Sequence, residues 1–177
     1  MRNLDEIEVT GWEPIGFSLS GEVRSFNPTN QTSLVLLENG AVAASIVIES
    51  QPQLGPGEHT QPFTFTGLAS GTYTLVVTKA GHLSFTILNI EIDGANVDLR
   101  LDSRVAVRTI RLLAGDVNGD GRIDAIDVNG IMANLGRPAS QVSVLFPFAD
   151  VNGDGVVDMQ DLLIVNSNFN RFPIVIN

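Results

Sequence analysis

Hydrophobic residues in the first hundred positions either alternate with polar residues or form short apolar runs, without a helical period. Turn-forming pairs separate these runs, most clearly Asn39-Gly40, Ser70-Gly71 and Asp93-Gly94. The pattern predicts strands at 17–25, 33–37, 41–48, 62–66, 73–78, 83–92, 97–101 and 105–112. Their number and spacing favour an all-β, Ig-like antiparallel sandwich as a first domain over residues 1–104.

The hydrophobic pattern becomes helical in the last third of the chain. Apolar residues recur at intervals of three and four over 125–135 and again over 159–169, and Gly136 and Pro138 follow the first of these segments. We therefore predict a second, small all-α domain over residues 105–177. Its inner face is expected to consist of Val128, Ile131, Leu135, Leu162, Val165 and Phe169.

The connection between the two predicted domains contains no Pro- or Ser-rich linker. Strand-like residues 105–113 run directly into the second domain, so we expect that domain to be held rigidly against the sandwich. The C-terminal segment 171–176 is too apolar for a free tail. We expect it to pack near Leu112 and Leu113 or on the sandwich.

A twelve-residue motif precedes each predicted helix, first at 116–127 (the first loop) and again at 150–161 (the second loop). Oxygen-bearing side chains occupy positions 1, 3, 5, 9 and 12, and glycine occupies position 6, where the backbone needs a positive φ. Position 7 offers its backbone carbonyl. This spacing is that of an EF-hand calcium loop, so we predict two Ca²⁺ ions. The predicted ligands are Asp116, Asn118, Asp120, Arg122, Asp124 and Asp127, and Asp150, Asn152, Asp154, Val156, Asp158 and Asp161.

Both loops depart from an ordinary EF-hand. Position 12 is aspartate instead of glutamate, so the carboxylate has a shorter reach. The entering helix is missing in both copies, because 107–115 reads as a strand and turn, and Pro147 interrupts the segment before the second loop. Each unit is therefore predicted to be a half EF-hand. The apolar residues at position 8, Ile123 and Val157, are expected to pair the two loops back to back.

These loop-helix repeats, over 115–135 and 150–169, resemble the duplicated repeats of a dockerin. The second repeat is most similar to the type II class, which carries apolar residues where type I dockerins carry a Ser-Thr pair. Those positions are Ala125-Ile126 and Met159-Gln160 here. Residues 65–82 resemble carboxypeptidase-regulatory-like domains, a fold that X modules share, and X modules often precede type II dockerins. The resemblance implies an X-module followed by a type II dockerin.

The resemblance also implies a protein partner. Several apolar helix residues fall outside the predicted inner face and, with polar neighbours, favour a docking surface. The predicted partner-binding residues are Ala125, Ile126, Met132, Met159, Gln160, Leu163, Asn166 and Ser167. The implied partner is a cohesin, of type II, on a scaffoldin or cell-surface anchoring protein of a cellulosome. Because the two helices differ at equivalent positions, we favour a single binding orientation.

The formal net charge of −10 changes this interpretation little. The two loops contain eight of the twenty acidic residues, and two bound Ca²⁺ ions would add four positive charges and bring −10 to −6. No basic stripe exists to neutralise phosphates, which argues against a nucleic acid partner. Cysteine is absent, which excludes disulfides and thiolate metal sites, and no stretch has the length of a membrane span. We expect an extracellular, cell-surface location, as the C-terminal part of a larger secreted protein.

Catalytic chemistry has little support in the sequence. His59 and His82 lack partners at the spacing of a triad or a metalloprotease site, so we expect two surface histidines and no enzyme. Trp12 is expected to pack at the sandwich edge or at the domain junction. Two alternatives to cohesin binding remain: a calcium-stabilised spacer of a secreted protein, and a carbohydrate-binding sandwich.

Overall fold

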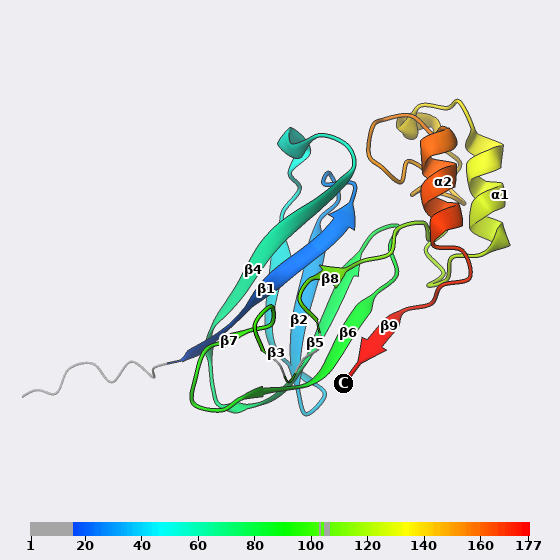
Figure 1. Ribbon diagram of the computed structural model, residues 1–177. Coiled ribbons are helices and arrows are strands. Elements are labelled where there is room, and N and C mark those ends of the chain that lie inside the picture. The colour runs from blue at the N-terminus through cyan, green and yellow to red at the C-terminus, as the bar shows by residue number, and fades with distance from the viewer. Residues whose placement is uncertain (1–15, 103, 105–106) are drawn as a thin grey trace, which may run out of the picture.

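A computed structural model describes residues 16–102, 104 and 107–177 of the 177-residue chain. The expectations for the N-terminus and for Trp12 lie outside the described residues. Two sheets form an elongated sandwich, and two helices stand side by side at one end of it (Figure 1). No helix in the described ranges is long and apolar enough to cross a membrane.

Each described strand except β9 overlaps a predicted range, although β7 and β8 are only two residues long. One sheet has the order β4-β1-β7, with β8 also pairing with β1, and the other has the order β3-β2-β5-β6-β9. Most neighbours are antiparallel, but β7, β8 and β9 pair in parallel with β1 or β6. The bounds are β1 Phe17–Phe26, β2 Thr32–Glu38, β3 Ala41–Ile48, β4 Glu58–Leu68, β5 Gly71–Lys79, β6 Phe85–Ile92, β7 Val97–Asp98, β8 Ile110–Arg111 and β9 Ile174–Ile176, with a 3₁₀ turn at Pro52–Leu54.

Alternation along the strands builds the sandwich core. In β5 the side chains of Tyr73, Leu75 and Val77 are buried while those between them are more exposed, as expected for a strand with one covered face. Leu34 and Leu36 of β2, the neighbour of β5 in the same sheet, and Leu19 and Val23 of β1, in the facing sheet, join them in one continuous core. The next inward residue on β5 is Lys79, so the core becomes polar at the end nearest the helices.

The helices begin at their loops through reciprocal capping. α1 spans Ala125–Asn134 and α2 spans Met159–Ser167, with a 3₁₀ turn at Ala139–Gln141 between them. Asp124 caps α1 by accepting a hydrogen bond from the Ile126 amide, while the Asp127 side chain accepts one from the Asp124 amide. Asp158 and Asp161 repeat this capping box at α2. Position 9 and position 12 of each loop therefore fix where its helix starts.

The prediction that the second domain is a small all-α fold is wrong. The described part of the molecule is 42% strand and 16% helix, with two α-helices, and the segment after the sandwich consists mainly of loops and short bridges. Its last residues, in β9, extend the five-stranded sheet beside β6. Two helices of ten and nine residues cannot enclose a hydrophobic core alone, so residues of the sandwich complete the core of this segment.

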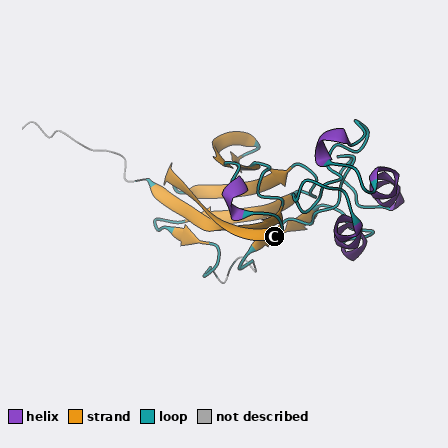
Figure 2. Ribbon diagram, turned by 90° about the horizontal axis from the view of Figure 1, so that it is seen from above, coloured by secondary structure: helices purple, strands orange, loops and turns teal. Residues whose placement is uncertain are grey.

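The sandwich and the loop-helix segment share a second core. Leu83 and Phe26 of the sandwich pack with Ile131 of α1 and Val165 of α2. Backbone hydrogen bonds fasten the two parts, from the Leu83 amide to the Leu113 carbonyl and between Gly115 and Gly81 (both 2.9 Å). Seen from above, the two helices appear end-on and lie beyond one end of the sandwich (Figure 2).

Candidate functional site

Backbone amides hold the first carboxylate of the first loop. Asp116 is buried, and its Oδ1 accepts hydrogen bonds from the amides of Gly119 (2.8 Å) and Asp120 (3.0 Å), while Oδ2 accepts one from Gly121 (3.0 Å). Gly121, at position 6, has a φ of +85°, which is the sharp turn expected there. The loop therefore bends around the Asp116 side chain.

The carboxylate at position 12 closes the same loop from the helix side. Asp127 is fully buried, and its Oδ1 accepts a hydrogen bond from the Val117 amide (2.9 Å) while Oδ2 accepts one from Asp124 (2.8 Å). Asp161 makes the equivalent contacts to Val151 (2.8 Å) and Asp158 (2.9 Å). These bonds use part of the lone-pair capacity of each carboxylate and leave the rest for another ligand.

Electrostatics of the loops suit a cation. Burial raises the pKa of the Asp116 carboxyl, and the nearby Asp127 charge adds to the rise. Burial likewise raises the pKa of Asp127, Asp150 and Asp161. Within the described residues, no lysine or arginine pairs with a loop carboxylate. Buried carboxylates without a counter-charge are costly, so the donor set fits a divalent ion with a preference for oxygen.

Acidic side chains alone do not complete a site. In the part of the chain that the structure describes, no group of three or more acidic or histidine side chains is arranged to hold a metal ion. Ca²⁺ takes six to eight oxygen ligands, so the amide oxygens of Asn118 and Asn152 and the position 7 carbonyls of Arg122 and Val156 are needed as well.

The apolar residues at position 8 do not pair with each other as predicted. Ile123 instead exchanges backbone hydrogen bonds with 170–171, just beyond α2, through Asn170 N to Ile123 O (2.8 Å). Val157 does the same with 136–137, just beyond α1, through Gly136 N to Val157 O (2.8 Å). Both side chains are fully buried, because this crossed pairing turns them into the shared core. Each loop is thus tied to the end of the other helix.

All eight predicted partner-binding residues are exposed, three on α1 and five on α2. The most exposed of the apolar ones is Leu163, at 65%. Side chains 159, 160, 163, 166 and 167 fall on one side of α2 by helical spacing.

The predicted inner face of the two helices is correct at Ile131 and Val165 but wrong at Leu135 and Phe169. These two residues are exposed because the helices end before them.

The sandwich also borders this surface, which was not among the predictions made from the sequence. A groove of about 510 Å³ lies beside α2, with Gln160 and Leu163 on one side and Pro56 and Gly57 of the β3–β4 connection on the other. The Gly57 amide also donates to the Asn152 carbonyl (2.8 Å), which fixes that connection against the second loop. A signal existed in the proline- and glycine-rich composition of 51–57, but its position relative to α2 depends on tertiary packing.

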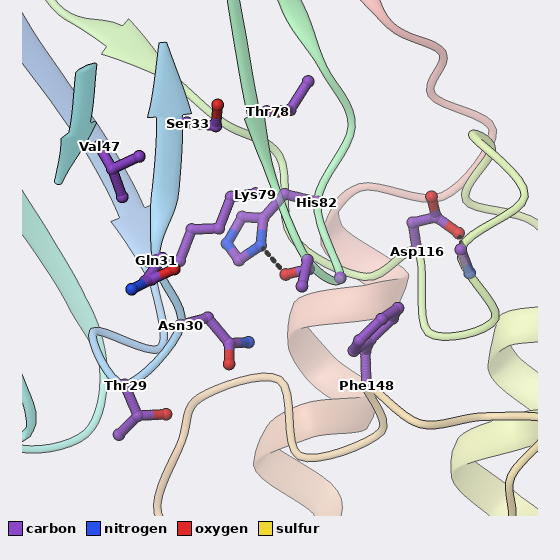
Figure 3. A pocket seen from close by; sticks show the side chains of 13 residues that line it. Thr29, Asn30, Gln31, Ser33, Val47, Thr78, Lys79, His82, Asp116 and Phe148 are labelled. Atoms are coloured by element: carbon purple, nitrogen blue, oxygen red, sulfur yellow. Dashed lines mark hydrogen bonds between the residues drawn. The ribbon is translucent and has the colours of Figure 1, made fainter. Parts of the chain in front are cut away.

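A second depression, of about 620 Å³, lies at the junction near the first loop. Figure 3 shows Lys79 and His82 on one wall, facing Asn30, with Asp116 and Phe148 across the depression. Burial lowers the pKa of Lys79 to about 8 and that of His82 to about 4. His82 is therefore not the surface residue predicted, and its Nε2 has no hydrogen-bond partner within the described structure.

Comparison with known proteins agrees with this architecture. Residues 114–170 match the family model of the dockerin type I domain. A solved type II cohesin–X-dockerin complex from Acetivibrio cellulolyticus, an N-terminal interface mutant, is similar with a TM-score of 0.63 at 24% identity, covering 89% of this chain and 97% of that chain. A C-terminal interface mutant of the same type of complex is similar with a TM-score of 0.62 at 23% identity, with the same coverage. No curated protein matches.

The fold and the loops together define a calcium-loop module joined to a β-sandwich. Residues 114–170 match the dockerin family model, and the chain shares the fold of the X-dockerin modules in these complexes.

Proposed function

We propose that this chain is a non-catalytic attachment module that binds a cohesin and so joins a secreted protein to a cellulosome-like extracellular assembly. One observation carries the proposal: two repeated helices, each started by an acidic loop, both expose large apolar side chains. Ile126, Met132, Met159 and Leu163 are each at least half exposed. Side chains of this kind gain free energy when a partner covers them.

Two Ca²⁺ ions, one in each loop, are the second part of the proposal. When bound, each ion would neutralise carboxylates that have no protein counter-charge. The chain's own contribution is positional: Asp127 and Asp161 join each loop to the first turn of its helix. Ion binding would therefore add to the folding free energy and fix the direction in which the helices present their exposed side chains.

The partner class proposed is a type II cohesin. Ala125-Ile126 and Met159-Gln160, three of them apolar, stand in place of Ser-Thr pairs and support it, and the similar solved structures are type II complexes. The family model that matches carries the type I name. Binding to one representative cohesin of each type, measured by calorimetry in Ca²⁺, tests this choice directly. Tighter binding to the type I cohesin would overturn the proposed class.

Calcium dependence is tested with the same pair of proteins. We expect chelation to abolish cohesin binding and to reduce the helical circular dichroism signal. Restoring Ca²⁺ should recover both. Unchanged affinity and spectrum after chelation would contradict the calcium part of the proposal.

The docking surface is tested by charge substitution. Leu163→Asp should weaken cohesin binding by about 30-fold or more, because a central apolar contact contributes on the order of 2 kcal/mol. Val144→Asp is the matched control, since Val144 is 91% exposed and lies outside both helices. If the chain is instead a calcium-stabilised spacer without a cohesin partner, the parent protein and both variants would show no cohesin binding.

A further inference from the structure

Each loop contains an Asn-Gly pair that the metal chemistry does not explain. The position 4 glycine is not a predicted ligand, yet it follows the position 3 asparagine in both copies. The chain contains four such pairs: Asn39-Gly40, Asn118-Gly119, Asn129-Gly130 and Asn152-Gly153. A glycine after asparagine has no Cβ to shield its backbone nitrogen, so that nitrogen can reach the asparagine side chain when the backbone is free to rotate.

We propose that Asn118 and Asn152 are sites of spontaneous deamidation that the closed loops protect and the open loops expose. The glycine backbone nitrogen, after losing its proton, attacks Cγ of the asparagine. A new N–Cγ bond forms, the bond from Cγ to the side-chain nitrogen breaks, and ammonia leaves with the proton. Water then opens the five-membered succinimide at either carbonyl and gives aspartate or isoaspartate. The net reaction consumes one water and releases one ammonia, without any oxidant or reductant.

In the first loop, hydrogen bonds hold both reacting groups in place. The Gly119 amide, which supplies the nucleophile, donates to Asp116 Oδ1 at 2.8 Å. A carboxylate acceptor keeps this proton in place, since deprotonation would leave two negative groups in contact. The side chain of Asn118 is fixed at both ends by Asp120, as its Oδ1 accepts from the Asp120 amide (3.0 Å) and its Nδ2 donates to Asp120 Oδ2 (2.9 Å).

The second loop repeats this protection and adds burial. The Gly153 amide donates to Asp150 Oδ1 (3.0 Å), and Asn152 is fixed by Asp154 through Oδ1 (2.8 Å) and Nδ2 (2.9 Å). Asn152 is only 5% exposed. A Cβ on Gly153 would come within 2.6 Å of the Asn27 side chain, so the sandwich packs directly against Gly153. Succinimide formation needs a rotation that this packing blocks.

Asn39-Gly40 provides an internal control. It forms the exposed turn between β2 and β3, where both residues have positive φ and nothing lies within 4 Å of a Cβ on Gly40. The other end of β2 is the end nearest the first loop, because residues 29–31 line the junction depression with Asp116. Opening of the loops should therefore leave the chemistry at Asn39 unchanged.

Deamidation would prevent an opened loop from returning to its closed conformation. Isoaspartate adds a methylene to the backbone between positions 3 and 4, so the amides of 119–121 can no longer all reach Asp116. The inference rests on the proposed calcium function in one respect, namely that the ion keeps each loop closed. The protection by the folded loop itself does not depend on that function.

The experiment follows the four Asn-Gly peptides by liquid chromatography and mass spectrometry after incubation in mildly alkaline buffer. The full chain is incubated with Ca²⁺, with chelator, and in urea. Purified Asn118→Asp and Asn152→Asp variants provide the aspartate peptides, so that isoaspartate is recognised by its different elution. We expect deamidation at 118 and 152 to be at least about tenfold slower with Ca²⁺ than in urea, since only the open fraction reacts.

Chelator should raise the rates at 118 and 152 toward the urea values while the rate at 39 stays constant. Slow reaction with and without Ca²⁺, but fast reaction in urea, would uphold loop protection and contradict the proposed calcium function. Reaction at 118 and 152 in the Ca²⁺ sample as fast as in urea would overturn the inference. So would a chelator effect of equal size at Asn39.

Discussion

Replacing Asn27 by alanine should separate the second loop from the sandwich and destabilise the whole chain. Asn27 follows β1, is 7% exposed, and has a left-handed φ of +53°. Its Nδ2 donates to the Asp150 carbonyl (3.1 Å), and its Oδ1 accepts from the amide (3.2 Å) and hydroxyl of Thr29. One side chain thus joins the start of the second loop to the turn after β1.

The size of the effect follows from these contacts. Loss of the bond to the Asp150 carbonyl costs about 1 kcal/mol, and leaving the Thr29 donors without their acceptor costs about 1 kcal/mol more. Alanine at a left-handed φ, which asparagine tolerates better, adds about 1 kcal/mol. The expected loss is therefore about 3 kcal/mol. With a urea m-value of about 2 kcal/mol/M, the unfolding midpoint should fall by about 1.5 M.

Urea unfolding in Ca²⁺, followed by circular dichroism, measures this loss. Asn30→Ala is the control, since it makes the same substitution three residues further along the turn, where the described structure records no side-chain hydrogen bond. We expect the control to stay within about 0.5 kcal/mol of the parent. An Asn27→Ala loss no larger than the control would refute the reasoning.

A site-resolved measurement sharpens the same prediction. The position 6 glycines, Gly121 and Gly155, each report one loop by the chemical shift of their amides. In a Ca²⁺ titration, Asn27→Ala should weaken the response of Gly155 more than that of Gly121. Equal weakening at both would show that the sandwich does not act on the second loop in particular.

Three further predictions concern the junction, α1 and β9. His82→Gln should reduce the loss of stability on acidification. The pKa of His82 is about 4 in the fold and about 6.5 in the unfolded chain, so the unfolded chain binds more protons between these pH values. In the parent protein this lowers the free energy of unfolding by about 2 kcal/mol from pH 7.5 to 5. Stability-pH curves of the two proteins check this, and parallel curves would contradict it. Gly130→Ala should destabilise by about 1–3 kcal/mol despite alanine's helix propensity, because its Cβ would come within 2.4 Å of Phe146; a higher melting temperature would refute it. Deleting 173–177 should cost about 2 kcal/mol, since Ile174 and Ile176 pack on the sandwich core, and an unchanged urea midpoint would count against this.

The strands and helices could be predicted because their signals are local. Alternation in β5 and helical spacing in α2 give the type of each element, and acidic residues before Ala125 and Met159 indicate where the helices start. The ends of the helices were predicted less accurately than their starts. At Leu135 the backbone leaves the helix with a ψ of 131°, so an apolar residue that continues the period faces solvent.

Features that depend on distant pairing could not be read from the sequence. The parallel pairing of β9 with β6 joins residues about ninety positions apart. A run of only three apolar residues does not determine the register of its pairing with another strand. Asn27, before Pro28, reads as an ordinary turn residue, although its side chain contacts Asp150. His82 follows a turn glycine, which suggested exposure, but the loop-helix segment covers it.

The crossed pairing at position 8 has a consequence for how the two loops act together. Ile123 holds the chain just beyond α2, and Val157 holds the chain just beyond α1, so each helix is fixed at its start by its own loop and at its end by the other. Neither helix has both ends fixed unless both loops are closed. Short helices are marginal alone, so opening one loop frees an end of each. The proposed docking surface on both helices would therefore be sensitive to either loop, and a partner that needs both helices would respond to the pair as one unit.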